Sequence, residues 1–409
     1  MELKKIHISD IGKVVTGKTP RTSIVENYGG DIPFLTPSDD LSYKSVPKTG
    51  KTLTEQGLNE VKNCLLPPHS VCVSCIGTDL GKVVMTSEPT ITNQQFNSII
   101  PNRRFDADFV YYLMTLVGKE LNYLSKTSTA VPIINKSSFS NYEVEVPDLE
   151  TQEKIASILS SLDSKIELNR RINDNLEQQT QALFKSWFVD FEPFRGGKFV
   201  DSELGMIPEG WNIQPISSIF NFQEGPGIRN WQYVNNGTKF INIRCINNDI
   251  INIQNANMIS DEEAQGKYAH FMLKENDIVI SCSGTLGRKA LVLKEYLPLC
   301  LNTSVIRFTP RINRQLGFLY GYLGSSLFLN KQIELASGSV QANFGPIHLK
   351  GMSIAIPDNN VLNQFSDIVN SIIQKKKNII SESLRLTNLR DSILPKLMSG
   401  KIKIDKLNS

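Results

Sequence analysis

The chain has 409 residues, of which 40% are hydrophobic and 21% are charged, and its formal net charge at pH 7 is +3. This length favours two or three domains with hydrophobic cores of ordinary size. The mildly basic charge neither requires nor excludes a nucleic-acid partner, because acidic residues on one face can balance a basic face elsewhere.

The beginning of the chain, MELKKIHISD, is not followed by an apolar segment. We therefore expect no signal peptide. No run of 18 or more apolar residues occurs, so no membrane span is expected either. The sequence predicts a cytoplasmic protein whose six cysteines remain reduced.

The second half of the chain repeats the first. Residues 73–82 (VSCIGTDLGK) resemble residues 280–288 (ISCSGTLGR), because each has a β-rich run, a Gly-Thr turn and a cation after Leu-Gly. Four more pairs follow in the same order: 93–99 with 302–307, 109–113 with 318–322, 127–131 with 337–340, and 144–148 with 354–358. A repeat of this length predicts two similar modules in a pseudo-twofold assembly.

Each module mixes short β-rich segments with helical ones. We predict strands at residues 71–74, 83–85 and 91 in the first copy, and at residues 278–281 and 290–293 in the second. Helices are expected at residues 109–123 and 318–335. These patterns indicate the α+β (mixed α/β) class and leave the order of the strands open.

A heptad pattern follows the Pro-Asp that closes each module. In the first copy, Asn169 and Asn173 interrupt one register of apolar a and d positions, which is formed by Ile155, Leu159, Leu162, Ile166, Leu176, Leu183 and Trp187. In the second copy, apolar residues recur every seven positions, at Phe365, Ile372, Ile379, Leu386 and Ile393. The d positions of that helix are mixed, since Lys376, Ser383 and Arg390 are polar.

These heptads predict two long helices that end near Phe188 and Met398. Each would be roughly 55 Å long at 1.5 Å per residue. The apolar stripe of each helix is narrow, so we expect the two to pair as an antiparallel coiled coil, with polar core residues fixing the register. The alternative is two surface helices, each packed on a separate domain.

The predicted division of the chain has four parts. Residues 1–148 form module 1 and residues 149–192 the first helical region. Residues 193–357 form a linker and module 2, and residues 358–409 the second helical region. The linker prediction depends on Pro193 and on the glycines between residues 196 and 210.

The two modules share a frame and differ in their polar loops, as modules that recognise different targets should. Asn and Gln can bind adenine bidentately, and Arg or Lys can bind guanine. Candidate DNA-binding residues of this kind are Lys18, Arg21, Asn93, Gln94 and Gln95 in module 1, and Arg229, Asn230, Arg244, Asn302, Thr303, Gln341 and Asn343 in module 2. Lys82 and Arg288, each after a Gly turn, are candidate phosphate contacts, which position DNA without specifying its sequence. For every one of these residues the alternative role is to cap a turn.

Four segments resemble the specificity subunits of type I restriction–modification systems. Gly17-Lys18-Thr19-Pro20 is similar to the family's Gly-x-Thr-Pro turn, and Asn93-Gln94-Gln95 is similar to its Asn-Gln segment. Residues 183–191 (LFKSWFVDF) and 389–402 (LRDSILPKLMSGKI) resemble the ends of its two helical regions. Module 2 departs from this pattern, because Gly225-Pro226-Gly227 replaces the Gly-Lys-Thr-Pro of module 1.

The resemblance implies two target recognition domains that each bind one half of a bipartite double-stranded DNA site. The helices would hold them apart like a ruler, since one added heptad lengthens a helix by about 10 Å, roughly three base pairs of duplex. It implies two modification subunits that carry S-adenosylmethionine and methylate adenine. Restriction subunits, where present, would use ATP and Mg for cleavage. This chain itself would be non-catalytic, without a cofactor or metal.

Two pairs of residues near the helix ends are candidate partner-docking positions: Trp187 with Phe188, and Leu397 with Met398. Trp187 and Phe188 could equally belong to an ordinary core. The competing function, from another class, is a coiled-coil scaffold that organises protein partners without recognising DNA.

Two motifs favour other chemistry but lack the required context. Residues 12–19 (GKVVTGKT) match the P-loop pattern, yet a P-loop needs a helix directly afterwards, and Pro20 with its neighbours allows none. Cys72 and Cys75 have the Cys-x2-Cys spacing of zinc sites, but in a strand they would point to opposite faces. The Asn-Pro-Pro-aromatic motif typical of adenine methyltransferases does not occur in the sequence.

Overall fold

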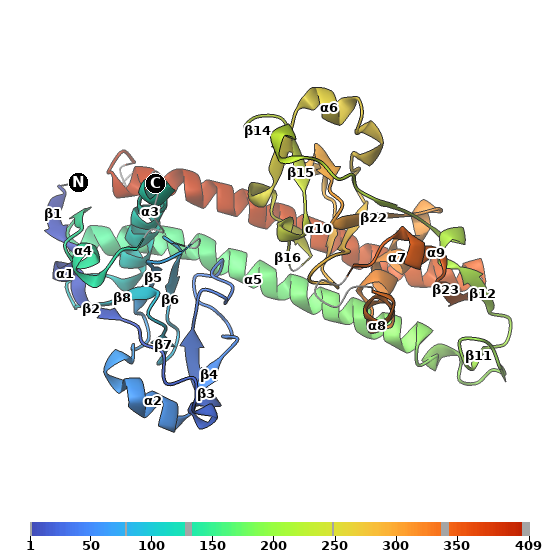
Figure 1. The fold of residues 1–409 in the computed structure, drawn as a ribbon, viewed down its shortest axis with the longest axis horizontal. Coiled ribbons are helices and arrows are strands. Elements are labelled where there is room, and N and C mark those ends of the chain that lie inside the picture. The colour runs from blue at the N-terminus through green and yellow to red at the C-terminus, as the bar shows by residue number, and fades with distance from the viewer. Residues whose placement is uncertain (1, 78–79, 127–132, 248, 337–342, 403–409) are drawn as a thin grey trace. The chain divides into compact units, whose positions relative to one another are not determined.

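The computed structural model describes the chain except for residues 1, 78–79, 127–132, 248, 337–342 and 403–409. The chain divides into two compact units (Figure 1). Unit 1 comprises Met1–Glu167 and Leu384–Ser409, and unit 2 comprises Leu168–Ser383. Each unit therefore contains one module and part of each of the two long helices, α5 (Leu149–Phe188) and α10 (Asn359–Met398). The predicted helix ends at Phe188 and Met398 are confirmed.

Module 1 is built around a four-stranded antiparallel sheet with the strand order β2-β8-β5-β6. A smaller sheet has the order β4-β3-β7, with β3 and β7 parallel, and β1 pairs with β9. The elements in chain order are β1 (Lys4–His7), α1 (Ile8–Ile11), β2 (Gly12–Thr16), β3 (Tyr28–Leu35), β4 (Thr52–Leu53), α2 (Glu55–Val61), β5 (Val71–Ser74), β6 (Val83–Met85), β7 (Ile91–Thr92), β8 (Phe96–Pro101), α3 (Ala107–Lys126), α4 (Lys136–Ser140) and β9 (Glu143–Val146).

Module 2 repeats this topology. Its main sheet is four-stranded and antiparallel with the order β13-β22-β19-β20, its second sheet also has four strands, in the order β14-β18-β15-β21, and β12 pairs with β23. The elements are β10 (Phe199–Val200), β11 (Ile207–Pro208), β12 (Asn212–Pro215), β13 (Phe220–Glu224), β14 (Tyr233–Val234), β15 (Thr238–Ile241), β16 (Ile246–Asn247), β17 (Ile250–Ile251), β18 (Asn257–Ile259), α6 (Asp261–Gln265), β19 (Ile278–Ser281), β20 (Lys289–Leu291), β21 (Leu299–Leu301), β22 (Val305–Pro310), α7 (Leu316–Gly324), α8 (Ser326–Leu335), α9 (Pro346–Lys350) and β23 (Ser353–Ile356).

The repeat extends to individual hydrogen bonds. The Ser74 hydroxyl accepts a hydrogen bond from the backbone N–H of Lys82, and the Ser281 hydroxyl accepts one from Arg288, both at 3.0 Å. Each module also has one parallel pair of strands, β3 with β7 in module 1 and β15 with β21 in module 2. In both modules the second strand of the pair directly precedes a strand of the main sheet, β8 or β22. The prediction of two similar modules is therefore confirmed.

One predicted helix is in fact two. Residues 318–335 do not form a single helix, because Ser325 adopts an extended backbone (φ −74°, ψ 152°) between α7 and α8. Its hydroxyl accepts a hydrogen bond from the N–H of Phe328 and caps α8. Ser at an N-cap satisfies an otherwise unpaired helix donor, which favours a new helix start at this position. Strand β20 also differs from the predicted 290–293, since it begins at Lys289 and ends at Leu291.

The central strands are buried on both faces, which explains their continuous apolar sequences. In β5, Val71 and Val73 belong to one hydrophobic cluster together with Cys75, while Cys72 belongs to another. Side chains alternate across a strand. The prediction that Cys72 and Cys75 point to opposite faces is thus confirmed, and burial raises the pKa of Cys75 to about 11.

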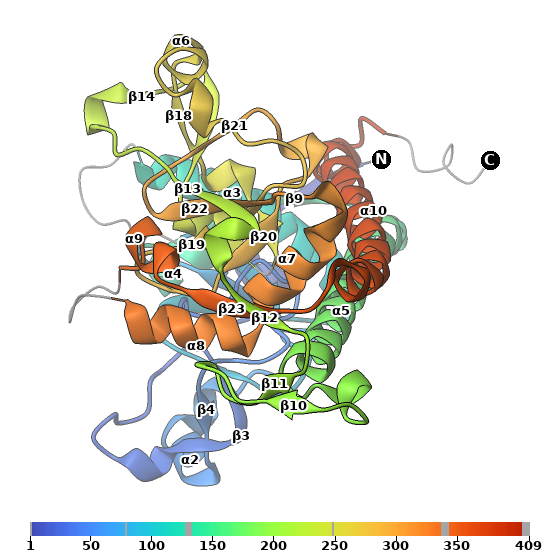
Figure 2. The same cartoon turned by 90° about the vertical axis from the view of Figure 1, so that its right-hand side faces the viewer.

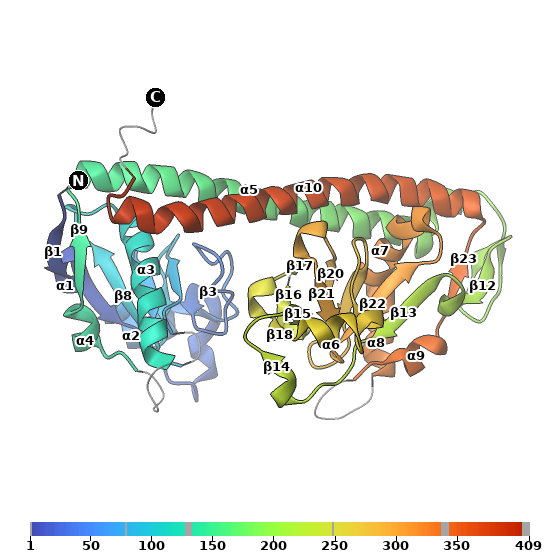
Figure 3. The same ribbon diagram turned by 90° about the horizontal axis from the view of Figure 1, so that it is seen from above.

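Each module packs a helix against both long helices. In unit 1, one cluster joins residues of α3 to Ile155 and Leu159 of α5 and to Leu394 of α10. In unit 2, α7 lies beside α5 and α10 (Figure 3). Phe318 of α7 packs against Phe184 of α5 and Phe365 of α10, with ring centroids 6.0 and 6.4 Å apart. The helix pair is therefore part of each module's core and not a separate rod.

This packing shifts the buried seam of α10 from the one predicted. Ile372, Ile379, Leu386 and Ile393 are only half-buried, whereas Ile373, Ile380 and Leu394 are almost completely buried. The heptad prediction assumed that α10 is buried by the partner helix alone. Since α10 also packs on the modules, its buried face is wider and displaced toward the adjacent positions.

The helices pair antiparallel through buried polar groups in each unit. In unit 1, Asp163 of α5 accepts a hydrogen bond from Arg390 of α10 at 2.7 Å. The hydroxyl of Tyr112 donates to the same carboxylate at 2.6 Å. In unit 2, where the helices lie side by side (Figure 2), Asn169 donates to Glu382 and Ser383 at 2.8 and 3.1 Å. The antiparallel pairing of the two helices, expected from the heptads, is confirmed.

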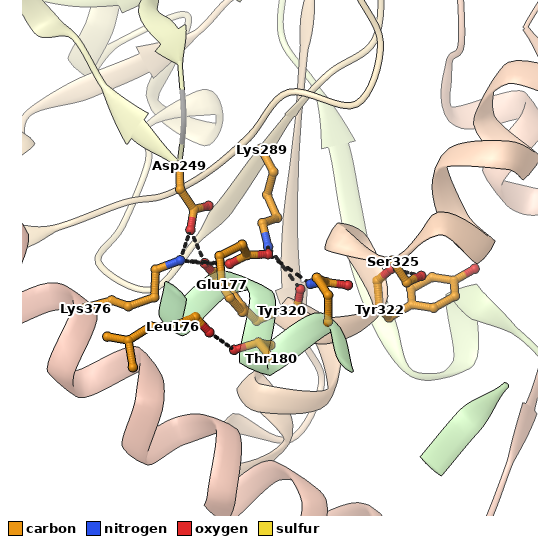
Figure 4. A network of polar contacts seen from close by, with 10 residues as sticks. Leu176, Glu177, Thr180, Asp249, Lys289, Tyr320, Tyr322, Ser325 and Lys376 are labelled. Atoms are coloured by element: carbon orange, nitrogen blue, oxygen red, sulfur yellow. Dashed lines mark hydrogen bonds and ion pairs between the residues drawn. The ribbon is translucent and has the colours of Figure 1, made fainter. Parts of the chain in front are cut away.

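A larger network lies between the helices and module 2 (Figure 4). Glu177 of α5 contacts the ammonium groups of Lys289 and Lys376, each at 2.8 Å, and accepts a hydrogen bond from Tyr320. Asp249 binds both Lys376 and Tyr320. Burial alone would raise the pKa of Glu177, but the two ammonium groups outweigh it and hold that pKa far below its usual range. Burial among carboxylates also raises the pKa of Tyr320 well above its usual value.

We expect Arg390→Met to destabilise unit 1 by about 3 kcal/mol or more, because it leaves the carboxylate of Asp163 buried without its cation. Arg385→Met, at an exposed position of the same helix, should change stability by less than about 0.5 kcal/mol. The unfolding free energy of unit 1 in both variants is measured by urea unfolding, monitored through hydrogen exchange of unit 1 peptides. Equal effects of the two substitutions would show that the Asp163–Arg390 pair contributes no special stability.

We expect the destabilisation of unit 2 by Glu177→Gln to depend on pH. The folded pKa of Glu177 lies below the unfolded value of about 4.3, so its stabilising contribution is complete above that pH and declines as the pH falls. The difference in unfolding free energy between wild type and variant should therefore be constant near neutral pH and shrink below about pH 4. Glu334→Gln, at an exposed carboxylate of α8, is the control. A difference that stays constant down to pH 3 would contradict the depressed pKa.

Candidate nucleic-acid interface

Four loops of module 1 meet at one end of its main sheet. The N–H of Gly17 donates to Phe96 and that of Lys18 donates to Thr92. A Cβ on Gly17 would lie 2.2 Å from the carbonyl oxygen of Asn93, so only glycine fits between these loops. The segments that begin at Cys75 and Ile133 join them, because the backbone N–H of Cys75 donates to the Gln95 carbonyl at 2.7 Å and the Cys75 carbonyl accepts from Ile134 at 2.9 Å. We call residues 17–23, 76–77, 80–82, 93–95 and 133–135 loop cluster 1.

Module 2 has the same arrangement. A Cβ on Gly225 would lie 2.5 Å from the carbonyl oxygen of Asn302. Cys282 donates to the Ser304 carbonyl at 3.0 Å and accepts from Phe344 at 2.8 Å. Loop cluster 2 therefore consists of residues 225–231, 283–288, 302–304 and 343–345. The structure brings most of the predicted candidates into these two clusters.

Two of the four candidate asparagines, Asn93 and Asn302, form hydrogen bonds within their own turns. The side-chain oxygen of Asn93 accepts a hydrogen bond from the N–H of Gln95 at 3.0 Å, and that of Asn302 accepts one from Ser304 at 2.9 Å. The amide of Asn93 also donates to the Gln95 side chain at 2.9 Å. These bonds are the turn-capping role that the sequence left open as the alternative.

The remaining candidates of loop cluster 1 are more accessible. Lys18 and Gln94 are exposed, and the Thr19 hydroxyl donates to Gln94 at 2.6 Å. Arg21 keeps 73% of its side chain exposed and forms an ion pair with Glu60 at 2.9 Å. Hydrogen bonds from the backbone and side chain of Arg21 lower the pKa of Glu60. Lys18 therefore offers a less engaged cation than Arg21.

The two predicted phosphate contacts differ. Lys82 is exposed, as a phosphate contact requires. Arg288 is half-buried, and its guanidinium donates to the backbone carbonyls of Ile243 and Ile246 at 3.3 and 3.2 Å. The structure thus gives Arg288 a role in holding a loop of module 2, which sequence position alone did not indicate.

Most other candidates of module 2 lie on its surface. Arg229, Asn230, Thr303 and Asn343 are exposed within loop cluster 2. Arg244 is also exposed, but it follows β15 and lies outside the cluster. Gln341 falls outside the described residues.

Three of the four docking candidates are corrected by the structure. Leu397 and Met398 are almost completely buried in the core of unit 1. Phe188 is buried against Phe318 and Phe365, with centroids 4.9 and 4.8 Å away. Their side chains fill this chain's own core, so they present no docking surface. Trp187 is only half-buried and packs on Phe194 and Phe365.

The P-loop match does not have P-loop geometry. Gly12–Thr16 forms β2, an edge strand of the main sheet, and residues 17–24 form no helix. The prediction that no helix of useful length follows Thr19 is confirmed. In the described residues, no helix is long and apolar enough to span a membrane.

Comparison with known proteins identifies the family. The model of the type I restriction modification DNA specificity domain matches residues 1–178 and 208–384. The specificity subunit of the type I restriction enzyme MjaIX from Methanocaldococcus jannaschii is 29% identical, over 99% of this chain and 94% of its own length. That of HindI from Haemophilus influenzae is 26% identical, over 80% of this chain and 83% of its own.

A solved structure shares the fold. The S subunit of a type I restriction–modification system from M. genitalium has a TM-score of 0.51 at 17% identity, and the match covers 97% of this chain and 96% of that one. The family model matches each module together with part of a long helix, well over half of the sequence in all. The chain therefore belongs to the DNA specificity subunits of type I restriction–modification systems.

Proposed function

We propose that the two modules each recognise one half of a bipartite DNA target, through loop clusters 1 and 2. The observation that supports this most is the shared frame with different contents. Equivalent backbone hydrogen bonds from Cys75 and Cys282 hold both clusters, while their exposed side chains differ. Gln94 occupies the position of Thr303, and Lys18 that of Pro226. Sequence is recognised by side chains at base edges, so different contents imply different half-sites.

The chain supplies specificity and its partners supply the chemistry. The relatives are named as specificity subunits of restriction enzymes, so modification and restriction subunits are the expected partners. In this proposal two modification subunits carry S-adenosylmethionine and methylate adenine in each half-site. Restriction subunits, where present, use ATP and Mg to translocate and cleave DNA. The chain itself is non-catalytic.

Trp187 remains a candidate docking residue for these partners, because it is half-buried at the end of α5. The exposed cations Lys18 and Lys82 belong to the same loop cluster and are suited to phosphates. Phosphate contacts position a protein on duplex DNA, while the neighbouring amides contact bases.

The first test maps methylation. The chain is expressed with its modification subunit in a host without adenine methylation, and modified adenines are mapped across the genome by single-molecule sequencing. We expect one split motif, with two defined halves around a fixed gap. Replacing residues 1–148 by the module of a relative should change one half and leave the other unchanged.

Two results would contradict the proposal. A continuous motif would show that the modules do not bind separate half-sites. Absence of methylation from a well-formed complex, whose chain also binds no DNA, would favour the scaffold function instead.

The second test measures the salt dependence of DNA binding. The slope of log affinity against log salt concentration is negative, and each lost phosphate contact reduces its magnitude by about 0.9. We expect Lys18→Ala and Lys82→Ala each to reduce the magnitude by about this amount. Lys154→Ala, at an exposed lysine of α5 in the same unit, is the matched control and should leave the slope unchanged. Unchanged slopes for both loop variants would remove these lysines from the interface.

A further inference from the structure

Trp231 in loop cluster 2 is unusually exposed. Its side chain is 80% exposed, more than any other large hydrophobic residue that the structure describes as exposed. The other two tryptophans of the chain, Trp187 and Trp211, pack within an aromatic cluster at the end of α5. An indole left in water loses the hydrophobic stabilisation that burial provides. Such exposure is typical of a residue that contacts a binding partner.

The turn that carries Trp231 is held rigidly. Gln232 is 7% exposed, and its side-chain amide donates to Glu263 at 2.7 Å and to the Tyr268 hydroxyl at 3.1 Å. The side-chain oxygen of Gln232 accepts a hydrogen bond from the N–H of Arg229 at 2.9 Å. One buried glutamine thus ties the turn 229–232 to α6 and to the tyrosine after it.

Both flanks of the turn are anchored as well. Ile228 and Tyr233 pack against a hydrophobic cluster that contains Phe240 and Tyr268. Tyr233 also begins β14, which pairs with β18. Trp231 is therefore displayed outward from a fixed base, so little conformational entropy is lost when it binds.

The neighbours of Trp231 suit nucleic acid. Arg229 and Asn230, on its N-terminal side, are both exposed. A Cβ on Gly227 would approach the Thr303 side chain at 3.4 Å, which places the start of this loop against the 302–304 turn of the same cluster. An aromatic ring beside a cation is a combination that packs on bases and contacts phosphate together.

We propose that Trp231 contacts DNA, with its indole packed against a base of the half-site that module 2 recognises. Arg229 contacts the adjacent phosphate. This inference rests on the proposed function and adds a specificity-determining residue to it. Asn and Gln side chains recognise base edges, whereas a rigid indole senses whether a base step can open or accept a flat apolar face.

Module 1 offers a natural comparison. Its equivalent turn, Val25–Asn27, precedes the Tyr28 that begins β3, and the buried Asn27 donates back to the Arg21 carbonyl at 3.1 Å. Counted from the buried Asn27 and Gln232, the position of Trp231 is occupied in module 1 by the exposed Glu26, and the residue before it, Val25, is 78% exposed. The turn thus presents an indole in module 2 and a carboxylate in module 1, so the contact belongs to one half-site only.

The experiment uses the full chain in complex with its modification subunit and a duplex that carries the mapped motif. Acrylamide quenching of tryptophan fluorescence is compared between wild type and Trp231→Phe, since the difference isolates Trp231. We expect that DNA protects this component from quenching. Trp231→Ala should weaken binding to the motif by about tenfold or more, the usual cost of losing a base-stacking aromatic. Val25→Ala, at an exposed apolar side chain of the module 1 turn, is the control and should change affinity by less than twofold.

The outcomes separate this inference from the function on which it rests. If the wild-type complex does not bind duplex DNA, or binds it with an affinity that does not depend on salt, the proposed function is contradicted. If it binds but the Trp231 component stays as accessible to acrylamide as before, and Trp231→Ala binds like wild type, only the Trp231 inference is overturned. An equal loss for motif and scrambled module 2 half-sites would show a backbone contact and overturn the base contact.

Discussion

Pairing of α5 with α10 through buried charges is the constraint on which both units depend. In each unit α5 contributes the carboxylate and α10 the cation: Asp163 with Arg390 in unit 1, and Glu177 with Lys376 in unit 2. The two carboxylates are 14 residues apart on α5 and the two cations are 14 apart on α10, which is two heptads. A register shift by one heptad would separate each buried carboxylate from its cation, at a large desolvation cost. Buried ion pairs add little net stability, but here they favour one register and one orientation.

A buried tyrosine connects each module to this pairing. Tyr112 of α3 and Tyr320 of α7 lie one position apart in the aligned repeat, and both donate to a carboxylate of α5. Neither module could therefore move along the helices without breaking a buried hydrogen bond and leaving an acceptor unpaired. Because the same helices complete both cores, the frame that presents loop cluster 1 or 2 depends on correct helix pairing.

The sequence predicted the parts of this fold that depend on local pattern. The repeat, the central strands and the ends of both long helices follow from apolar periodicity and from matching turns, which act over short distances. The break at Ser325 was missed because the apolar pattern continues across it, and only the extended backbone reveals the new cap. The displaced seam of α10 was missed because burial of Ile373 and Ile380 depends on contacts with the module as well as with α5.

The candidate site shows the same limit at the level of single side chains. Residue type identified Lys82 and Arg288 as cations after glycine turns, but it could not distinguish the exposed Lys82 from Arg288, whose guanidinium binds two backbone carbonyls. Likewise Asn93 has the right chemistry for adenine, yet its oxygen caps a turn. In both clusters the loops are joined by backbone hydrogen bonds, and they approach each other closely at a glycine, where a Cβ atom would clash. Such a frame places few demands on the exposed side chains. They are free to differ between modules, so recognition can change without a change of fold.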